Sequence, residues 1–544
     1  MFLRVMIKIA FLFILVLFTT NCKKWLDINH DPNQAVESNT NPDEVLPNAL
    51  VGTAKLTISP LQFVCNWMGY WSPYAGTIIN LEEQTYNITS NFNSIFFQNN
   101  YINSNHYQYI FEKASISNQG FYEGIAKIMK AYNFALLVDL YNNIPYRTAL
   151  RGIDGYTNLN YLFPSYDEGV FVYEDLIKQI DEGIAVIKDA TIDNNIRIST
   201  ADIMFKGDKI KWVKFGNTLK LRLLIHQANR SDRAGYIQAE ISKILAEGSG
   251  FLQSGENAAI NPGFEQATGK QNPYYDLYGF RFNGAVSTTI GANVYAMNLL
   301  KYDEDPRLYF FYKPTSSVYN PANPQPFPQP PPNSFRGNQY GLPISTATYR
   351  YQNAAYISGI GGLISAGPVT SASSGIVKGF NMDAWLLTSI ESLFLQSEAT
   401  YRGWITGDAK EVYKNAVQES FRWLNVGRNS NNISLSDDVF AAWYNIQDVN
   451  DNTNVSWDDA PDKYKLIMYQ KYLALNGIQS LETWTDYRRN GNFPNIALSA
   501  HPNRTASSIP IRLFYPQREY DLNTVNVKEQ GTINQFTSKI WWMP

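Results

Sequence analysis

Two pairs of acidic side chains have spacings that suit acid–base chemistry. Glu391 and Glu398 are seven residues apart in a segment with helical periodicity, and Glu482 and Asp486 are four apart, so each pair shares a helix face. Paired carboxylates are the catalytic groups of most glycosidases. Carboxylates at these spacings also pair with arginine and lysine. We therefore expect an ion-pairing role and keep a glycan-processing enzyme as the alternative.

Other catalytic machinery has no signature in this sequence. His30, His106, His226 and His501 are the only histidines, and none has metal-ligand spacing to another histidine or to Cys65. The sequence contains no phosphate-binding loop of the Walker type and no G-x-S-x-G nucleophile elbow. The sequence predicts no metal, no cofactor and no catalytic residue.

Two clusters of aromatic residues have the composition of a ligand site. Flat aromatic rings with amide or guanidinium groups beside them suit stacking and hydrogen bonding to neutral polar ligands. The candidates are Trp67, Trp71 and Tyr74 in the first cluster, and Tyr274, Tyr275, Tyr278, Arg281, Phe282 and Asn283 in the second. Trp67 and Trp71 are also spaced as a buried helix stripe, and the two interpretations stay open for them. Gly279 and Gly284 favour a loop, and so a ligand role, for the second cluster.

Composition narrows the classes of partner. The chain has 45 basic side chains, of which Arg4 and Lys8 lie in the first 21 residues, against 48 acidic ones. No basic excess is present to gather phosphates, so nucleic acid is not an expected partner. The aromatic content is 14%, with 36 Tyr and 12 Trp, and we expect more than half of these rings in the core.

The first 22 residues resemble a lipoprotein signal. Arg4 and Lys8 precede an apolar run from Ile9 to Phe18, which is too short for a stable transmembrane helix and ends just before Cys22. Thr19 and Asn21 depart from the usual residues before a lipidated cysteine, so an ordinary secretory signal is the alternative. We expect residues 1–21 to be removed and Cys22 to carry a lipid, which leaves Cys65 without a disulfide partner.

Apolar residues at spacings of three and four predict several helices. One stripe runs from Phe121 to Leu136 and a second from Val170 to Ile187, with a capping box formed by Ser165 and Glu168. A third helix follows Gly207-Asp208, with Lys209, Lys211, Lys214 and Lys220 on its outer face. A fourth, from about Ala384 to Arg402, and a fifth, from about Asp408 to Leu424, form a predicted antiparallel pair that resembles a tetratricopeptide unit.

The segment 248–380 has little periodicity and is rich in Gly, Asn, Pro and Tyr. Prolines between Pro314 and Pro332 favour polyproline II there. We expect one domain over 22–544, with a mainly α scaffold over about 40–247 and 381–544 and a loop-rich insert over about 248–380 that carries the ligand site.

Several motifs, spread from Cys22 to Asn523, resemble those of the SusD/RagB-like outer-membrane nutrient-binding lipoproteins. In chain order they are Trp25-Leu26-Asp27-Ile28-Asn29 with Asp31-Pro32-Asn33; Asp139 to Tyr146, with Asn142 where Gly is common; Gly207-Asp208 with Trp212, Phe215, Asn217 and Leu221-Arg222; Asp305-Pro306-Arg307; Glu398-Ala399 with Gly403; Gln470-Lys471 with Glu482, Trp484, Asp486 and Arg488-Arg489; and Pro510, Arg512, Tyr515-Pro516, Glu519 and Asn523. The physical interpretation of these motifs is mainly structural.

The resemblance implies a SusD-like fold of tetratricopeptide-like helix pairs without catalytic activity. It also implies a lipid-anchored outer-membrane protein, exposed at the cell surface, that captures oligosaccharides or, in some members, peptides. Its implied partner is a SusC-like TonB-dependent transporter. A tetratricopeptide-like scaffold that binds only protein is a further alternative, and the residues alone do not choose between carbohydrate and peptide.

Overall fold

The structure is a computed structural model of the 544-residue chain. It describes residues 40–58, 61–74, 80–191, 195, 197–285, 290–315, 334–342, 356–362, 374–428 and 434–544. The predicted signal, Cys22 and the opening motif lie outside the described residues, and so do His30 and the prolines from Pro321 to Pro332.

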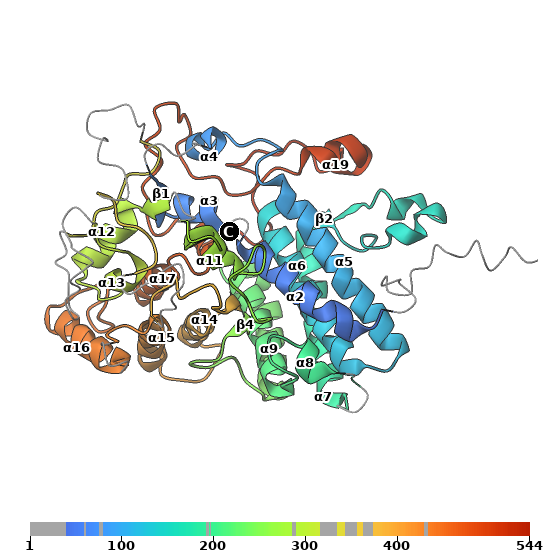
Figure 1. The fold of residues 1–544 in the computed structure, drawn as a ribbon, viewed down its shortest axis with the longest axis horizontal. Coiled ribbons are helices and arrows are strands. Elements are labelled where there is room, and N and C mark those ends of the chain that lie inside the picture. The colour runs from blue at the N-terminus through green and yellow to red at the C-terminus, as the bar shows by residue number, and fades with distance from the viewer. Residues whose placement is uncertain are drawn as a thin grey trace, which may run out of the picture.

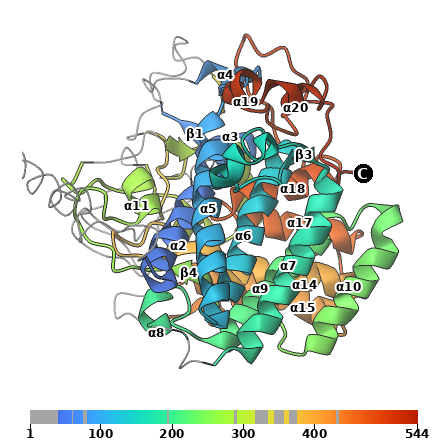
Figure 2. The same ribbon diagram turned by 90° about the vertical axis from the view of Figure 1, so that its right-hand side faces the viewer.

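Long helices make up the N-terminal half. In Figure 2, α5, α6 and α7 stand side by side, with α9 beside them. The elements up to residue 247 are α2 (Pro42–Ile58), α3 (Leu61–Trp67), β1 (Trp71–Pro73), α4 (Leu81–Thr85), α5 (Ser94–Ile116), α6 (Gly120–Tyr141), β2 (Ile144–Pro145), β3 (Tyr166–Asp167), α7 (Gly169–Asp189), α8 (Ile198–Ala201), α9 (Lys209–His226) and α10 (Ala234–Glu247).

The predicted apolar stripes of α6, α7 and α9 are confirmed as buried faces. Glycines let these helices approach closely. A Cβ added to Gly124 of α6 would lie 2.6 Å from the carbonyl oxygen of Gly183 in α7, and one added to Gly216 of α9 would lie 2.9 Å from Ile184. Glycine at the crossing points lets the helix backbones approach closely, because it has no side chain. The three helices therefore form one tightly packed layer.

Two details of this layer differ from the prediction. Ser165 and Glu168 do not form a capping box, because Tyr166 and Asp167 pair with β2 as a strand and the helix begins only at Gly169. Lys220 is not on an outer face either. It is fully buried, with its ammonium 2.7 Å from carboxylate oxygens of both Asp181 and Glu240, and that double pairing is what makes its burial possible.

The region between 248 and 388 contains short elements joined by irregular chain. Its elements are β4 (Ala258–Ile260), α11 (Pro273–Tyr278), β5 (Ile290–Ala292), α12 (Val294–Tyr302), α13 (Leu308–Phe311) and β6 (Ala384–Leu387). β1 pairs with β5 and β4 with β6, both antiparallel. The prediction that Ala384 begins a helix is wrong: Ala384–Leu387 is a buried strand, and the helix starts after Thr388, whose hydroxyl accepts from the Glu391 amide.

The C-terminal helices complete the scaffold around the insert (Figure 1). They are α14 (Ser389–Tyr401), α15 (Ala409–Leu424), α16 (Ser436–Val449), α17 (Lys463–Ala474), α18 (Ser480–Arg489), α19 (Gln517–Leu522) and α20 (Thr524–Lys528). α14 and α15 pack against each other as predicted, and Asp408 caps α15 by accepting from the amides of Lys410 and Glu411.

The segment around residue 541 closes the end of α6. Asn142, just after α6, has a φ of +69°, a left-handed conformation that is easiest for glycine. Its side-chain oxygen accepts from the Trp541 amide at 2.6 Å, and Asp139 accepts from the Trp542 indole at 2.9 Å. Residues about 400 positions apart therefore share one hydrogen-bonded cluster.

The described fold is thus mainly α, as predicted. It also contains three two-stranded sheets, which were not predicted from the sequence. Over the ranges given above, no helix combines the length and apolar character needed to cross a bilayer. In the same ranges, no group of three or more His, Cys, Asp and Glu side chains is arranged to hold a metal ion.

Candidate functional site

Five of the nine predicted ligand-binding side chains lie in the core. Trp67, Trp71, Tyr274, Tyr275 and Tyr278 are all at most 4% exposed. Trp67 donates its indole hydrogen to the Glu83 carbonyl at 3.1 Å and stacks on Phe92 with ring centroids 5.8 Å apart. In this conformation these five rings offer no face to a ligand, because other side chains already cover them.

The two predicted clusters nevertheless meet in space. Trp71 pairs with Ala292 across the β1–β5 sheet, and its ring lies 4.8 Å from that of Tyr278 in α11. Tyr278 in turn packs on Tyr274 at 5.0 Å. Segments about 200 residues apart in the sequence therefore build one buried aromatic cluster.

The other four predicted residues lie at the border of this cluster. Tyr74 is half-buried against β5, where a Cβ on Gly291 would lie 2.5 Å from its ring, so only glycine allows that approach. Arg281, Phe282 and Asn283 are exposed, Phe282 by 46%. Hydrogen bonds from the Arg281 amide to the Ala285 carbonyl and from the Gly284 amide to the Arg281 carbonyl close their segment into a tight turn. We call residues 281–285 the aromatic turn.

The carboxylates of the enzyme alternative are engaged in buried ion pairs. Glu391 accepts from Arg222 at 2.6 Å, and Glu398 accepts from Arg489 at 2.8 Å and from Arg402 at 2.9 Å. Lys471 lies 2.9 Å from Glu482 and 2.8 Å from Asp486. This arrangement agrees with the ion-pairing role expected from the spacing.

Burial and pairing shift these carboxylates in opposite directions. Burial raises the pKa of Glu391 to about 7, despite the opposing charge of Arg222. Burial would also raise the pKa of Glu398, but the guanidinium of Arg489 outweighs it and lowers the pKa to about 2. Glu398 is therefore held firmly as an anion between two arginines, which is a structural role.

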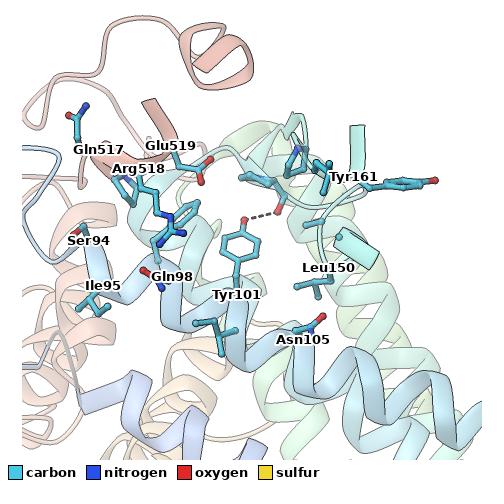
Figure 3. Close-up of a pocket in the computed structure, with 18 of the residues that line it drawn as sticks. Ser94, Ile95, Gln98, Tyr101, Asn105, Leu150, Tyr161, Gln517, Arg518 and Glu519 are labelled. Atoms are coloured by element: carbon cyan, nitrogen blue, oxygen red, sulfur yellow. Dashed lines mark hydrogen bonds between the residues drawn. The ribbon is translucent and has the colours of Figure 1, made fainter. Parts of the chain in front are cut away.

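A cavity of about 710 Å³ lies on α5, beneath the segment that enters α19. Figure 3 shows Tyr101 standing in its middle, where the phenol donates to the Pro145 carbonyl at 2.6 Å. Arg518 reaches down from α19 toward Gln98 of α5, and Glu519 lies beside it. Two short 3-10 helices, Gly152–Tyr156 and Leu159–Tyr161, form the opposite side, and Leu150 and Tyr161 line the cavity there. We call this hollow the α5 cavity and residues 151–163 the lobe.

Sequence reasoning did not identify the α5 cavity, although its signal is present. Ile95, Gln98, Ile102 and Asn105 follow one another at spacings of three and four, so they form one face of α5. All four are exposed and line the cavity. Alternating apolar and amide residues on one helix face do not stand out as a buried stripe does.

A second cavity, of about 600 Å³, is lined by Trp385, Trp423 and Lys378. Its two indoles already pack edge to face at 5.2 Å, and the Lys378 ammonium lies 4.2 Å from the centre of the Trp423 ring. The rings are therefore less available for stacking than the Phe282 ring of the aromatic turn.

Comparison with known proteins places this architecture. The family model described as SusD-like, starch-binding and associating with the outer membrane matches residues 32–516. None of the curated protein sequences matches significantly. Among solved structures, a protein of Bacteroides vulgatus described as a putative outer-membrane protein probably involved in nutrient binding is 22% identical, with 93% of this chain and 100% of that one covered and a TM-score of 0.69.

Two further structures have the same fold. A SusD homologue of Bacteroides fragilis is 20% identical, with 93% of this chain and 99% of that chain covered and a TM-score of 0.69. A chitin-binding SusD homologue of Flavobacterium johnsoniae is also 20% identical, with 91% and 98% covered and a TM-score of 0.67. The fold and the family match define an outer-membrane-associated protein of a nutrient-binding class. Since the family model spans most of its length, the chain belongs to the SusD-like family.

Proposed function

We propose that this protein is a lipid-anchored, non-catalytic capture protein at the cell surface. It binds oligosaccharides, or peptides, and delivers them to a SusC-like TonB-dependent transporter. Carbohydrate is the favoured ligand class, since the family is described as starch-binding and one structural neighbour as chitin-binding. The anchor is the predicted lipid on Cys22.

One observation carries the proposed binding site. The β1–β5 pairing joins the two aromatic clusters into a rigid core and leaves Tyr74 and the aromatic turn at its border. Tyr74 is three residues beyond the buried Trp71, and Phe282 is four residues beyond the buried Tyr278. Rings held by a rigid core lose little entropy when they stack on a sugar. Arg281 and Asn283 supply donors and acceptors for hydroxyl groups beside Phe282.

The test is a binding screen of the purified protein against oligosaccharides and peptides, followed by substitution at the turn. Phe282→Ala removes a ring that is half exposed, and we expect a loss of about 1–2 kcal/mol, roughly 5- to 30-fold in Kd, for the best ligand. Arg281→Ala should weaken binding of the same ligand. Tyr302→Ala is the matched control, because Tyr302 is 76% exposed on α12 and has no proposed role.

The outcomes separate the alternatives. Saturable binding without turnover that depends on Phe282 supports the proposal. Binding that is unchanged in both turn variants would refute this site, and turnover of the ligand that Glu482→Gln abolishes would favour the enzyme alternative.

A further inference from the structure

The α5 cavity is surrounded by apolar side chains that extend well beyond it. On the lobe, Ile153 is 67% exposed, Tyr156 86% and Leu159 66%, and Ile95 and Ile102 on α5 are each about half exposed. Large apolar side chains that gather on the exposed surface of a soluble protein often mark a contact with another molecule. Figure 1 shows the lobe, beside β2, projecting from the body of the protein.

Hydrogen bonds fasten the lobe to the C-terminal helices. Asn526 of α20 donates to the Phe163 carbonyl at 2.8 Å, and Asn523 donates to the Pro164 carbonyl at 2.9 Å. Within the lobe, the Arg151 guanidinium lies 3.9 Å from the centre of the Tyr161 ring. The exposed apolar surface is therefore presented by a braced element, as a docking surface requires.

Arg518 brings a positive charge to the lining of the cavity. It is exposed, and no ion pair or hydrogen bond is found for its side chain within the described part of the chain. Of the neighbouring acidic groups, Asp154 pairs with Arg151 at 3.1 Å. Glu519 keeps its negative charge, since the Tyr166 hydroxyl that donates to it at 2.8 Å is neutral. A carboxylate entering the cavity would meet this guanidinium and could accept two hydrogen bonds from it.

The amides on α5 suit a peptide backbone in the cavity. Gln98 and Asn105 are exposed, line the cavity and have no side-chain hydrogen bond in the described ranges. Amide side chains pair well with the backbone N–H and C=O groups of an extended peptide. A hydrocarbon chain would leave them unpaired at a cost. A small ligand would fill the cavity but would leave Ile153 and Tyr156 uncovered, so the surface suits a protein.

We infer that the α5 cavity and the lobe dock an extended segment of a protein partner, one that carries apolar side chains and a carboxylate that pairs with Arg518. This inference rests on the proposed delivery step, because the partner that delivery requires is the SusC-like transporter. Ile95 and Ile102 receive the apolar side chains, and Gln98 and Asn105 hold the backbone between them. The aromatic turn takes no part in this contact.

The test measures binding of the full chain to a purified SusC-like transporter of the same organism, in detergent, by a surface-based affinity assay. Arg518→Glu and Ile102→Gln should each weaken binding by roughly tenfold or more. Rising salt should weaken the wild type more than Arg518→Glu. Two matched controls should bind as the wild type does: Lys211→Glu reverses an exposed charge on α9, and Ile116→Gln removes an 83% exposed isoleucine at the end of α5.

Each other outcome overturns the inference. Equal binding of the transporter by the wild type, Arg518→Glu and Ile102→Gln would show that the α5 cavity is not part of the interface. The proposed delivery to the transporter would still stand. No binding of the transporter by the wild type would overturn both delivery and this inference, while glycan binding that depends on Phe282 would still stand. Binding of the Cys22→Ala chain to phosphatidylethanolamine vesicles that is lost in Ile102→Gln would assign the surface to lipid.

Discussion

Replacing Arg307 by methionine should destabilise the protein strongly. Arg307 and Asp305 belong to one of the motifs that resemble the family, and both side chains are fully buried, with nitrogen and oxygen 2.6 Å apart. The guanidinium also donates to Ser420 at 2.8 Å and to Gln470 at 2.7 Å. Arg307→Met fills much of the same volume but leaves the Asp305 carboxylate buried without a cation.

The magnitude follows from that uncompensated charge. Removing one partner of a buried ion pair costs about 3–5 kcal/mol. Unfolding entropy is about 2.1 cal/mol/K per residue, so a chain of 544 residues has about 1.1 kcal/mol/K, and the Tm should fall by about 3–5 °C if unfolding is cooperative. The drop is modest because the chain is long, so differential scanning calorimetry suits the measurement.

Two companion variants make the result decisive. Asp305→Asn combined with Arg307→Met removes both charges and should regain at least half of the loss. Arg151→Met breaks an exposed pair with Asp154 and should change the Tm by less than about 1 °C. The reasoning is refuted if Arg307→Met melts within 1 °C of the wild type, or if the double variant is no more stable than Arg307→Met.

Further predictions concern other groups. Burial alone would lower the pKa of His226, but Glu482 and Asp139 outweigh it and raise the pKa to about 9. Protonated His226 therefore contributes about 3 kcal/mol to the free energy of unfolding below pH 6.5, and this contribution is lost as the pH rises toward 9. Calorimetry of His226→Asn over this pH range should show no such decline in stability. Burial would raise the pKa of Glu398, but Arg489 outweighs it and lowers the pKa to about 2. The ionised carboxylate therefore stabilises the fold above pH 4.5, and this contribution is lost as the pH falls toward 2. Glu398→Gln should reduce the dependence of stability on pH in the acid range. Burial raises the pKa of the Cys65 thiol, so a thiol reagent such as a maleimide should label it only after unfolding, with an unfolded sample as the reference. Cys22→Ala should release the protein from membranes and impair uptake while ligand affinity stays within twofold, and a variant that remains in the membrane fraction would contradict the proposed anchor.

Helices with a strong local signal were predictable from the sequence. The stripe of α7 was correct because apolar residues repeat every three or four positions over 21 residues. The starts of α9 and α15 were correct because Asp208 and Asp408 are local caps. β3 and β6 were missed because two- and four-residue strands carry too little periodicity, and β6 exists only through pairing with β4, more than 120 residues earlier.

The ligand site was predictable in composition but not in exposure. Trp67 and Trp71 have the same i,i+4 spacing whether they face a core or a ligand, and only the packing of Phe92 and Tyr278 on them settles that they are buried. Phe282 differs from Tyr278 through the turn that follows α11, not through residue type. The exposure of an aromatic side chain depends on packing between segments far apart in the sequence, so a local sequence pattern cannot predict it.

The cluster at the end of α6 is completed by a segment that is synthesised about 400 residues after the helix. Asp139 accepts a hydrogen bond from Trp542, which lies 403 residues later in the chain. At about 5–20 residues per second, the ribosome synthesises Trp542 roughly 20–80 s after Asp139. Until then the buried Asp139 carboxylate lacks one of its hydrogen-bond donors. A contact between residues so far apart in the sequence closes a very large loop, so we expect the end of α6 to become ordered late in folding.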